Sequence, residues 1–191
     1  MKGGSTDQIL AGQIILIICC IFYLIWWSMS YRPGTDVNKV GGVRGVLLLA
    51  TALCGLAGVI ISAMWAGSVP AGGSKLTGTT VAAAGVIVYI VLLLITKNLL
   101  GRQVTTELFL IVGWVVLEVT VLLALKRSGG IGPGGFAFMI AVVAAAFAVS
   151  MILYVMYYRM EAGKAFYAAM VPLITEAVSM AALVITVLAA R

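Results

Sequence analysis

Six long runs of apolar residues divide the chain and predict six membrane-spanning helices. The runs cover approximately residues 9–29, 45–66, 79–96, 105–125, 135–157 and 165–190. A helix needs about 20 largely apolar residues to cross the hydrocarbon core of a bilayer, where no water satisfies backbone N–H and C=O groups. The runs are apolar on all sides, whereas the strands of a membrane barrel alternate polar and apolar positions. The pattern therefore predicts an all-α, polytopic membrane protein.

The connections between these runs are short and rich in glycine, as in residues 67–78 and 126–135. Glycine and proline clusters of this kind are typical of turns outside the bilayer. Because short links place consecutive helices side by side in opposite directions, we expect three antiparallel hairpins. The runs use most of the chain, which leaves a single transmembrane domain over residues 1–191 and no separate soluble domain.

The composition agrees with this interpretation. The chain is 63% hydrophobic and 9% charged, with a mean hydropathy of +1.20, whereas soluble domains are about half apolar and a quarter charged. The net charge is +6, but the basic residues are scattered over short loops and form no continuous stripe, so we expect no nucleic-acid partner. The expected environment is the lipid bilayer, as a plasma membrane or a bacterial inner membrane.

The distribution of basic residues predicts an orientation. The loops after the first, third and fifth helices carry Arg32, Lys39, Arg44, Lys97, Arg102, Arg159 and Lys164. The opposite side carries Lys2, Lys75, Lys126, Arg127 and Arg191. Since cytoplasmic loops are enriched in lysine and arginine, this difference predicts that both termini lie on the non-cytoplasmic side.

Small residues recur at every fourth position of the second run and predict close helix packing. They are Ala50, Cys54, Gly58, Ser62 and Ala66. Four-residue spacing places them in one stripe on a helix, where a second backbone can approach.

Aromatic residues recur late in the odd-numbered helices. They are Tyr23, Tyr89 and Tyr154, together with Trp26, Trp27, Tyr31, Tyr157 and Tyr158. Because amphipathic rings are favoured at the membrane–water boundary, we interpret them as part of an interfacial belt.

No cofactor, metal site or enzymatic centre is predicted. The chain has no histidine, and its cysteines Cys19, Cys20 and Cys54 form no C-x-x-C pair, so the usual zinc and haem ligands are missing from the sequence. We interpret the cysteines as buried, inert thiols. No nucleophile–base pair is recognisable, and we expect the protein not to be an enzyme.

Two of the six acidic residues fall well inside predicted spans. Glu118 lies in an apolar setting, with Trp114 one turn before it. A charged side chain at bilayer depth costs at least about 2.5–3.5 kcal/mol on insertion scales, so intramembrane acids are candidates for functional sites. Desolvation favours the neutral acid, which lets such a group take up and release protons. Glu107, in the first turn of its helix, is expected to be solvated and to complement the helix dipole.

Glu176 has the more polar surroundings of the two acids. Pro172 lies one turn before it, and Thr175 and Ser179 add hydroxyl groups. Proline has no N–H and clashes with the carbonyl four residues earlier, so it kinks the helix and frees that carbonyl. A carboxylate beside an interrupted helix is typical of solute and ion sites within membranes. We therefore rank Glu176 above Glu118 as a substrate- or proton-binding residue.

These features favour a small-solute or ion transporter or channel, with proton coupling through the two glutamates. One alternative is a substrate-binding subunit of a larger complex, because the size and helix number resemble the substrate-binding components of energy-coupling-factor vitamin transporters. That resemblance implies a bound vitamin and ATPase partner subunits, but the family's small-residue docking pattern is absent from ILAGQIILIICCIFYLIWW at residues 9–27. A second alternative is a non-transporting assembly or lipid-interacting protein. The sequence is compatible both with a homo-oligomer and with a complex that includes a partner subunit.

Overall fold

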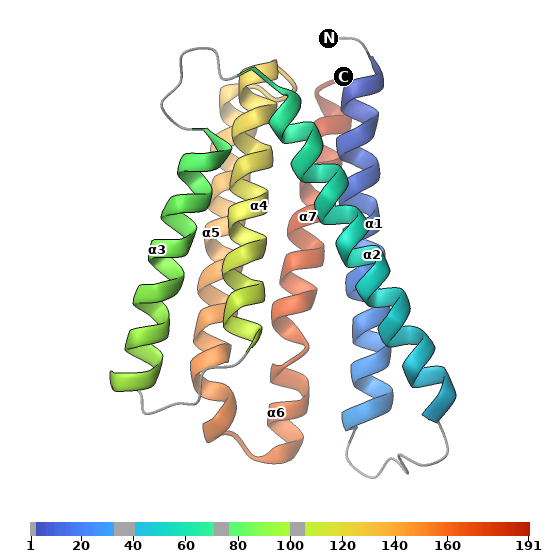
Figure 1. The fold of residues 1–191 in the computed structure, drawn as a ribbon, viewed down its shortest axis with the longest axis vertical. Coiled ribbons are helices and arrows are strands. Elements are labelled where there is room, and N and C mark those ends of the chain that lie inside the picture. The colour runs from blue at the N-terminus through green and yellow to red at the C-terminus, as the bar shows by residue number, and fades with distance from the viewer. Residues whose placement is uncertain (1–2, 33–40, 71–76, 100–105) are drawn as a thin grey trace.

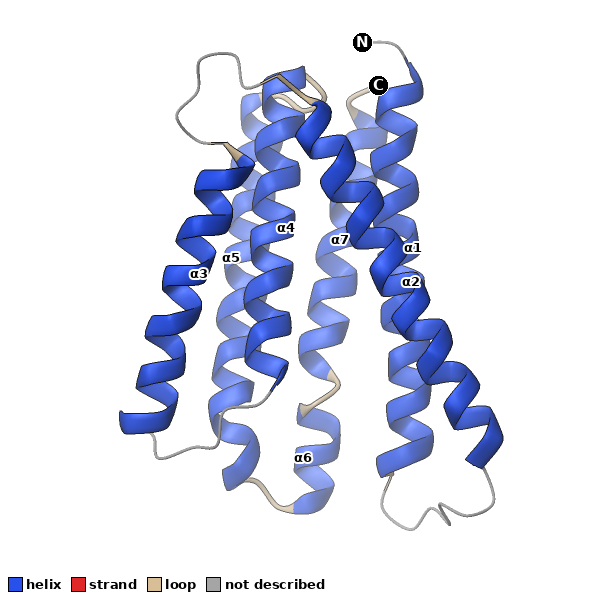
Figure 2. Ribbon diagram, in the orientation of Figure 1, coloured by secondary structure: helices blue, strands red, loops and turns tan. Residues whose placement is uncertain are grey.

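The protein is described by a computed structural model that covers residues 3–32, 41–70, 77–99 and 106–191, and this part contains helices and no strands (Figure 2). The helices are α1 (Gly3–Tyr31), α2 (Gly41–Ser68), α3 (Gly78–Leu94), α4 (Thr106–Ser128), α5 (Pro133–Met156), α6 (Ala162–Ala168) and α7 (Val171–Ala189). A π-helical turn, η2 (Ile95–Leu99), extends α3, and a 3-10 turn, η3 (Tyr157–Arg159), extends α5. The all-α prediction is confirmed.

Six helical segments in the described residues are long and apolar enough to cross a membrane. They are Thr6–Tyr31, Gly42–Ser68, Gly78–Leu99, Glu107–Ser128, Pro133–Met156 and Ala162–Ala189. Each overlaps one predicted run, so the prediction of six spans is confirmed. By the length and composition of its helices, the chain is an integral membrane protein.

Consecutive spans alternate in direction, and α1 begins at the same end of the bundle at which α7 ends (Figure 1). An ion pair between Asp7 and Arg191 joins these two ends. Within the bundle, α1 packs on α2 and α7, while α4 packs on α2, α3 and α5. The cytoplasmic or non-cytoplasmic location of the terminal end stays a prediction.

The stripe of small residues on α2 forms a close contact with α1. Gly58, Ser62 and Ala66 are buried, and Ala50 and Cys54 are half-buried. A Cβ atom added to Gly58 would lie 2.6 Å from Cγ of Leu16, and one added to Gly12 would lie 2.5 Å from Oγ of Ser62. The two backbones therefore approach more closely than larger side chains would allow, as the four-residue spacing predicts.

The main core fills the end of the bundle at which the termini lie. It combines residues from α4, such as Leu122 and Leu125, with Leu183 and Val187 from α7 and Ile9 from α1. Residues of α4 and α7 thus meet in one cluster, which places the two intramembrane glutamates on helices that share the interior. By contrast, α3 lies at the edge of the bundle (Figure 1).

The last span, Ala162–Ala189, is interrupted beside Pro172, where the sequence predicts a kink. Helix α6 ends at Ala168, Ala169 and Met170 form a turn, and α7 begins at Val171 with Pro172 in its first turn. Proline is favoured there because the first helical residues need no N–H partner. Ala169 and Met170 both keep right-handed helical backbone angles, so the break is a local irregularity within one apolar span. In the turn, the Met170 N–H donates to the Tyr167 carbonyl rather than to the Phe166 carbonyl of a regular α-helix.

Candidate functional site

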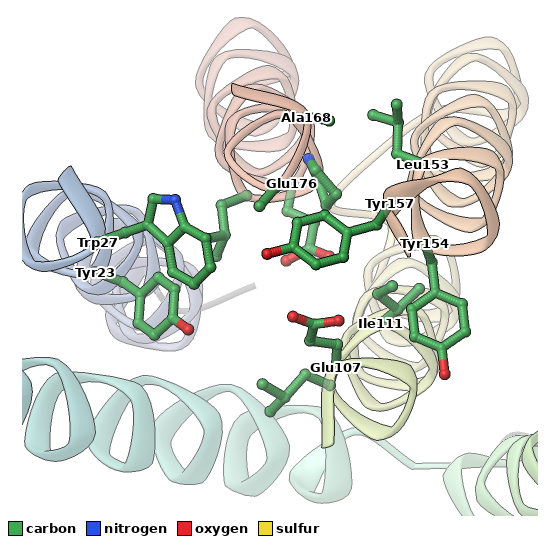
Figure 3. A pocket seen from close by; sticks show the side chains of 13 residues that line it. Tyr23, Trp27, Glu107, Ile111, Leu153, Tyr154, Tyr157, Ala168 and Glu176 are labelled. Carbon is green, nitrogen blue, oxygen red and sulfur yellow. The ribbon is translucent and has the colours of Figure 1, made fainter. Parts of the chain in front are cut away.

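A pocket opens beside the α6–α7 break (Figure 3). The break lies toward the end of the bundle opposite to the termini (Figure 1). The pocket has a volume of about 90 Å³, which is enough for several water molecules. Its wall combines two carboxylic acids, four aromatic residues and a set of small or apolar residues. The last set consists of Leu110, Ile111, Leu153, Ala168, Ala169, Pro172 and Leu173.

Glu176 lies in the wall of this pocket, one turn into α7. The break brings it there, because α6 and α7 meet at Ala169 and Met170 and the pocket includes Ala168, Ala169 and Pro172. Its side chain is half-buried. Cys20 from α1 lies near its carboxyl group. Of the residues predicted for the site, Glu176 and Pro172 are the two that line the pocket.

Glu118 lies deeper in the bundle, and its side chain is fully buried, with 0% exposure. The Gln13 amide from α1 is also buried and is near enough to interact with the Glu118 carboxyl group. No hydrogen bond of standard length and angle reaches the polar side-chain atoms of either residue in the described part of the chain. Glu118 and Glu176 are near enough to repel each other when both are charged.

Further hydroxyl groups in the interior lack hydrogen-bond partners. Ser62 on α2, Ser150 on α5 and Ser179 on α7 are each fully buried, and no hydrogen bond from a described residue reaches their Oγ atoms. Buried polar groups in proteins are nearly always satisfied by protein or ordered water, so these hydroxyl groups are polar positions within an otherwise apolar interior. Ser179 therefore stays a candidate, although it does not line the pocket.

The remaining two predicted site residues have other surroundings. The Thr175 hydroxyl donates to the Pro172 carbonyl at 2.8 Å, which stabilises the first turn of α7. Trp114 is buried in the main core, and no described residue accepts a hydrogen bond from its Nε1 atom. Neither residue lines the pocket, and their part in the site stays a prediction.

Several pocket residues were not assigned to a site from the sequence. Glu107, expected to be solvated at the start of its helix, points its carboxylate into the pocket (Figure 3). Tyr23 and Trp27 from α1 face Tyr154 and Tyr157 across it, although their positions late in the odd-numbered spans suggested an interfacial belt. The sequence contained a signal for this arrangement. Tyr23 and Trp27 are four residues apart and Tyr154 and Tyr157 are three apart, so each pair is expected on one face of its helix.

The Trp27 side chain is held by the break in the last span. Its Nε1 atom donates to the Phe166 carbonyl at 3.3 Å. In a regular helix this carbonyl would accept from Met170, but that N–H donates to Tyr167. The interruption that brings Glu176 to the pocket thus also supplies the hydrogen-bond acceptor that orients an aromatic ring of its wall.

Gln13 was also missed as a neighbour of Glu118. The available signal was a single amide within the apolar run at residues 9–29. Which helix it would face depends on the lateral order of the spans, which the apolar runs do not specify.

Comparisons of the chain with protein-family models, with curated proteins and with solved structures gave no match. The function is therefore argued from the geometry of the pocket and of the two intramembrane glutamates.

Proposed function

We propose that the protein is a small membrane transporter that moves a solute or ion and exchanges protons at Glu176 and Glu118. The observation that carries this proposal is the position of Glu176 in the wall of a pocket at one end of the bundle. A carboxyl group there can meet both water and a solute. An intramembrane acid whose only role is to stabilise helix packing needs no access to water or to a solute.

Glu118 supports the proposal as a second proton-binding group. It is fully buried, it lies near Glu176, and its polar neighbour Gln13 makes no hydrogen bond of standard geometry to it. An unpaired carboxylate in such a place is costly, so the neutral form is favoured until water or a cation reaches it. Two neighbouring acids also resist being charged together, which links proton release at one to the state of the other.

The test is proton movement in liposomes that contain the purified protein and a pH-sensitive dye. A membrane potential is imposed, with and without a panel of small amines, amino acids and inorganic cations. We expect a protein-dependent pH change in at least one condition. It should be abolished in Glu176→Gln, which keeps the shape of the side chain but cannot bind or release the proton.

The matched control is Glu161→Gln. Glu161 is exposed and pairs with Lys164 outside the pocket, so this variant should move protons like the unchanged protein. Equal proton movement in Glu176→Gln, or none in any condition for the unchanged protein, would refute the proposal.

The second candidate function is a substrate-binding subunit of a larger transport complex. One observation favours it: the pocket lies at one end, whereas the other end is filled by the main core around Leu122 and Leu183. A subunit of this kind binds its ligand but needs partner subunits to move it. Ligand binding without flux by the protein alone would favour this candidate.

A further inference from the structure

We propose that the pocket binds a small organic cation, meaning a positively charged amine with apolar substituents, and that this is the class of solute the protein moves. Only the statement that the protein moves this class of solute rests on the proposed function. The binding site itself is argued from the charge, the aromatic rings and the shape of the pocket.

The charge of the wall favours a cation. Glu107 from α4 and Glu176 from α7 are both part of it. In Figure 3 the Glu107 carboxylate points toward the middle of the pocket from the side opposite to Glu176. Two carboxyl groups on facing walls attract a positive charge placed between them and repel an anion.

The aromatic residues favour an organic cation in particular. Tyr23 and Trp27 form one side of the pocket, and Tyr157 also lines it (Figure 3). The negative face of an aromatic ring attracts an ammonium group, and sites for quaternary ammonium ligands use several such rings. Trp27 is suited to this role because its hydrogen bond to the Phe166 carbonyl holds the indole in place.

The apolar part of the wall favours an organic cation over an inorganic one. The oxygen-bearing side chains of the described wall are the two glutamates and three tyrosines, whereas Leu110, Ile111, Leu153 and Leu173 offer only methyl groups. A small inorganic cation gains nothing from methyl groups, because it requires oxygen ligands or its own water. An ammonium group surrounded by methyl or methylene groups instead places its charge near the carboxylates and its carbon surface against these side chains.

The test uses choline as the probe and 3,3-dimethylbutan-1-ol as its uncharged analogue of nearly the same shape. Binding to the full chain in detergent is measured by isothermal titration calorimetry. We expect saturable binding of choline and at least about tenfold weaker binding of the alcohol, which corresponds to the loss of one strong charged contact. Sodium at the same ionic strength should not compete.

Four variants locate the site. Glu176→Gln and Trp27→Leu should each weaken choline binding by about tenfold, and Glu107→Gln should also weaken it. Glu161→Gln, outside the pocket, should leave it unchanged. Glu107→Gln and Trp27→Leu keep the test valid if Glu176→Gln fails to fold, which circular dichroism and size-exclusion chromatography report.

The outcomes separate this inference from the proposed function. Equal binding of choline and the alcohol, no saturable binding of choline, or unchanged affinity in all three pocket variants would overturn the cation site. Choline binding without proton movement in liposomes would support the site and contradict transport. Proton movement without choline binding would support transport and contradict the organic-cation site.

Discussion

At the scale of single residues, the most unusual feature is the pair of Glu118 and Gln13. Both side chains are buried and near each other, yet no described residue gives either a standard hydrogen bond. Removing a charge from water without a partner costs far more than removing a neutral polar group. The pair is therefore best accounted for by a neutral glutamic acid, with water serving the remaining polar atoms.

The first prediction concerns Glu118→Gln. Because the amide replaces a neutral acid of nearly the same shape, the free energy of unfolding should change by less than about 1 kcal/mol. The measurement is thermal or denaturant unfolding in detergent, with Glu161→Gln as the control at an exposed site. A loss of about 3 kcal/mol or more would contradict this account, because it would mean that the carboxyl group makes a strong buried interaction that the amide cannot reproduce.

At the scale of elements, the α6–α7 break links the fold to the site. It places Ala168, Ala169 and Pro172 in the pocket wall and leaves the Phe166 carbonyl for Trp27. The apolar run at residues 165–190 indicated a helix long enough to span the bilayer, and Pro172 indicated where its regularity would fail. The sequence did not indicate that the freed acceptor would bind a side chain from the first span, because that contact joins residues 139 positions apart.

The second prediction concerns Pro172→Ala. With an N–H at position 172, α6 and α7 can join into one helix, and Met170 can then bond to Phe166. Trp27 would lose its acceptor, so choline affinity should fall severalfold while the melting temperature stays the same or rises. Titration calorimetry and thermal unfolding measure the two effects.

Pro133→Ala is the control for this variant, since Pro133 stands in the first turn of α5 and does not line the pocket. It should leave choline affinity unchanged. Unchanged affinity in Pro172→Ala would show that the break does not organise the site.

At the scale of the whole molecule, the sequence predicted the parts that depend on distance along the chain. The six spans and the close packing of α2 through Gly58 and Ser62 follow from the length of the runs and from four-residue spacing. The pocket depends instead on lateral order. It joins Tyr23 of the first span, Glu107 of the fourth and Glu176 of the last, and spans that are apolar on all sides do not specify which faces meet.

The same limit explains how the aromatic residues were interpreted. Tyr23, Trp27 and Tyr157 occur near the ends of their spans, where a ring at the membrane boundary and a ring in a pocket wall look alike in sequence. The arrangement of α1, α4, α5 and α7 turns these rings toward the two acids (Figure 3). The polar site is therefore formed by the packing of the helices and is not recognisable from the mostly apolar composition.

The most direct test of this account is infrared difference spectroscopy of the protein in lipid, which detects protonation of Glu176 as pH is varied. The groups near its carboxyl are Glu118, Cys20 and the acids and tyrosines of the pocket wall, so the Glu176→Gln difference isolates its signal. We predict a C=O band of the protonated acid that grows as pH falls and is missing from the variant. Identical spectra for the two proteins at every pH would contradict proton exchange at Glu176.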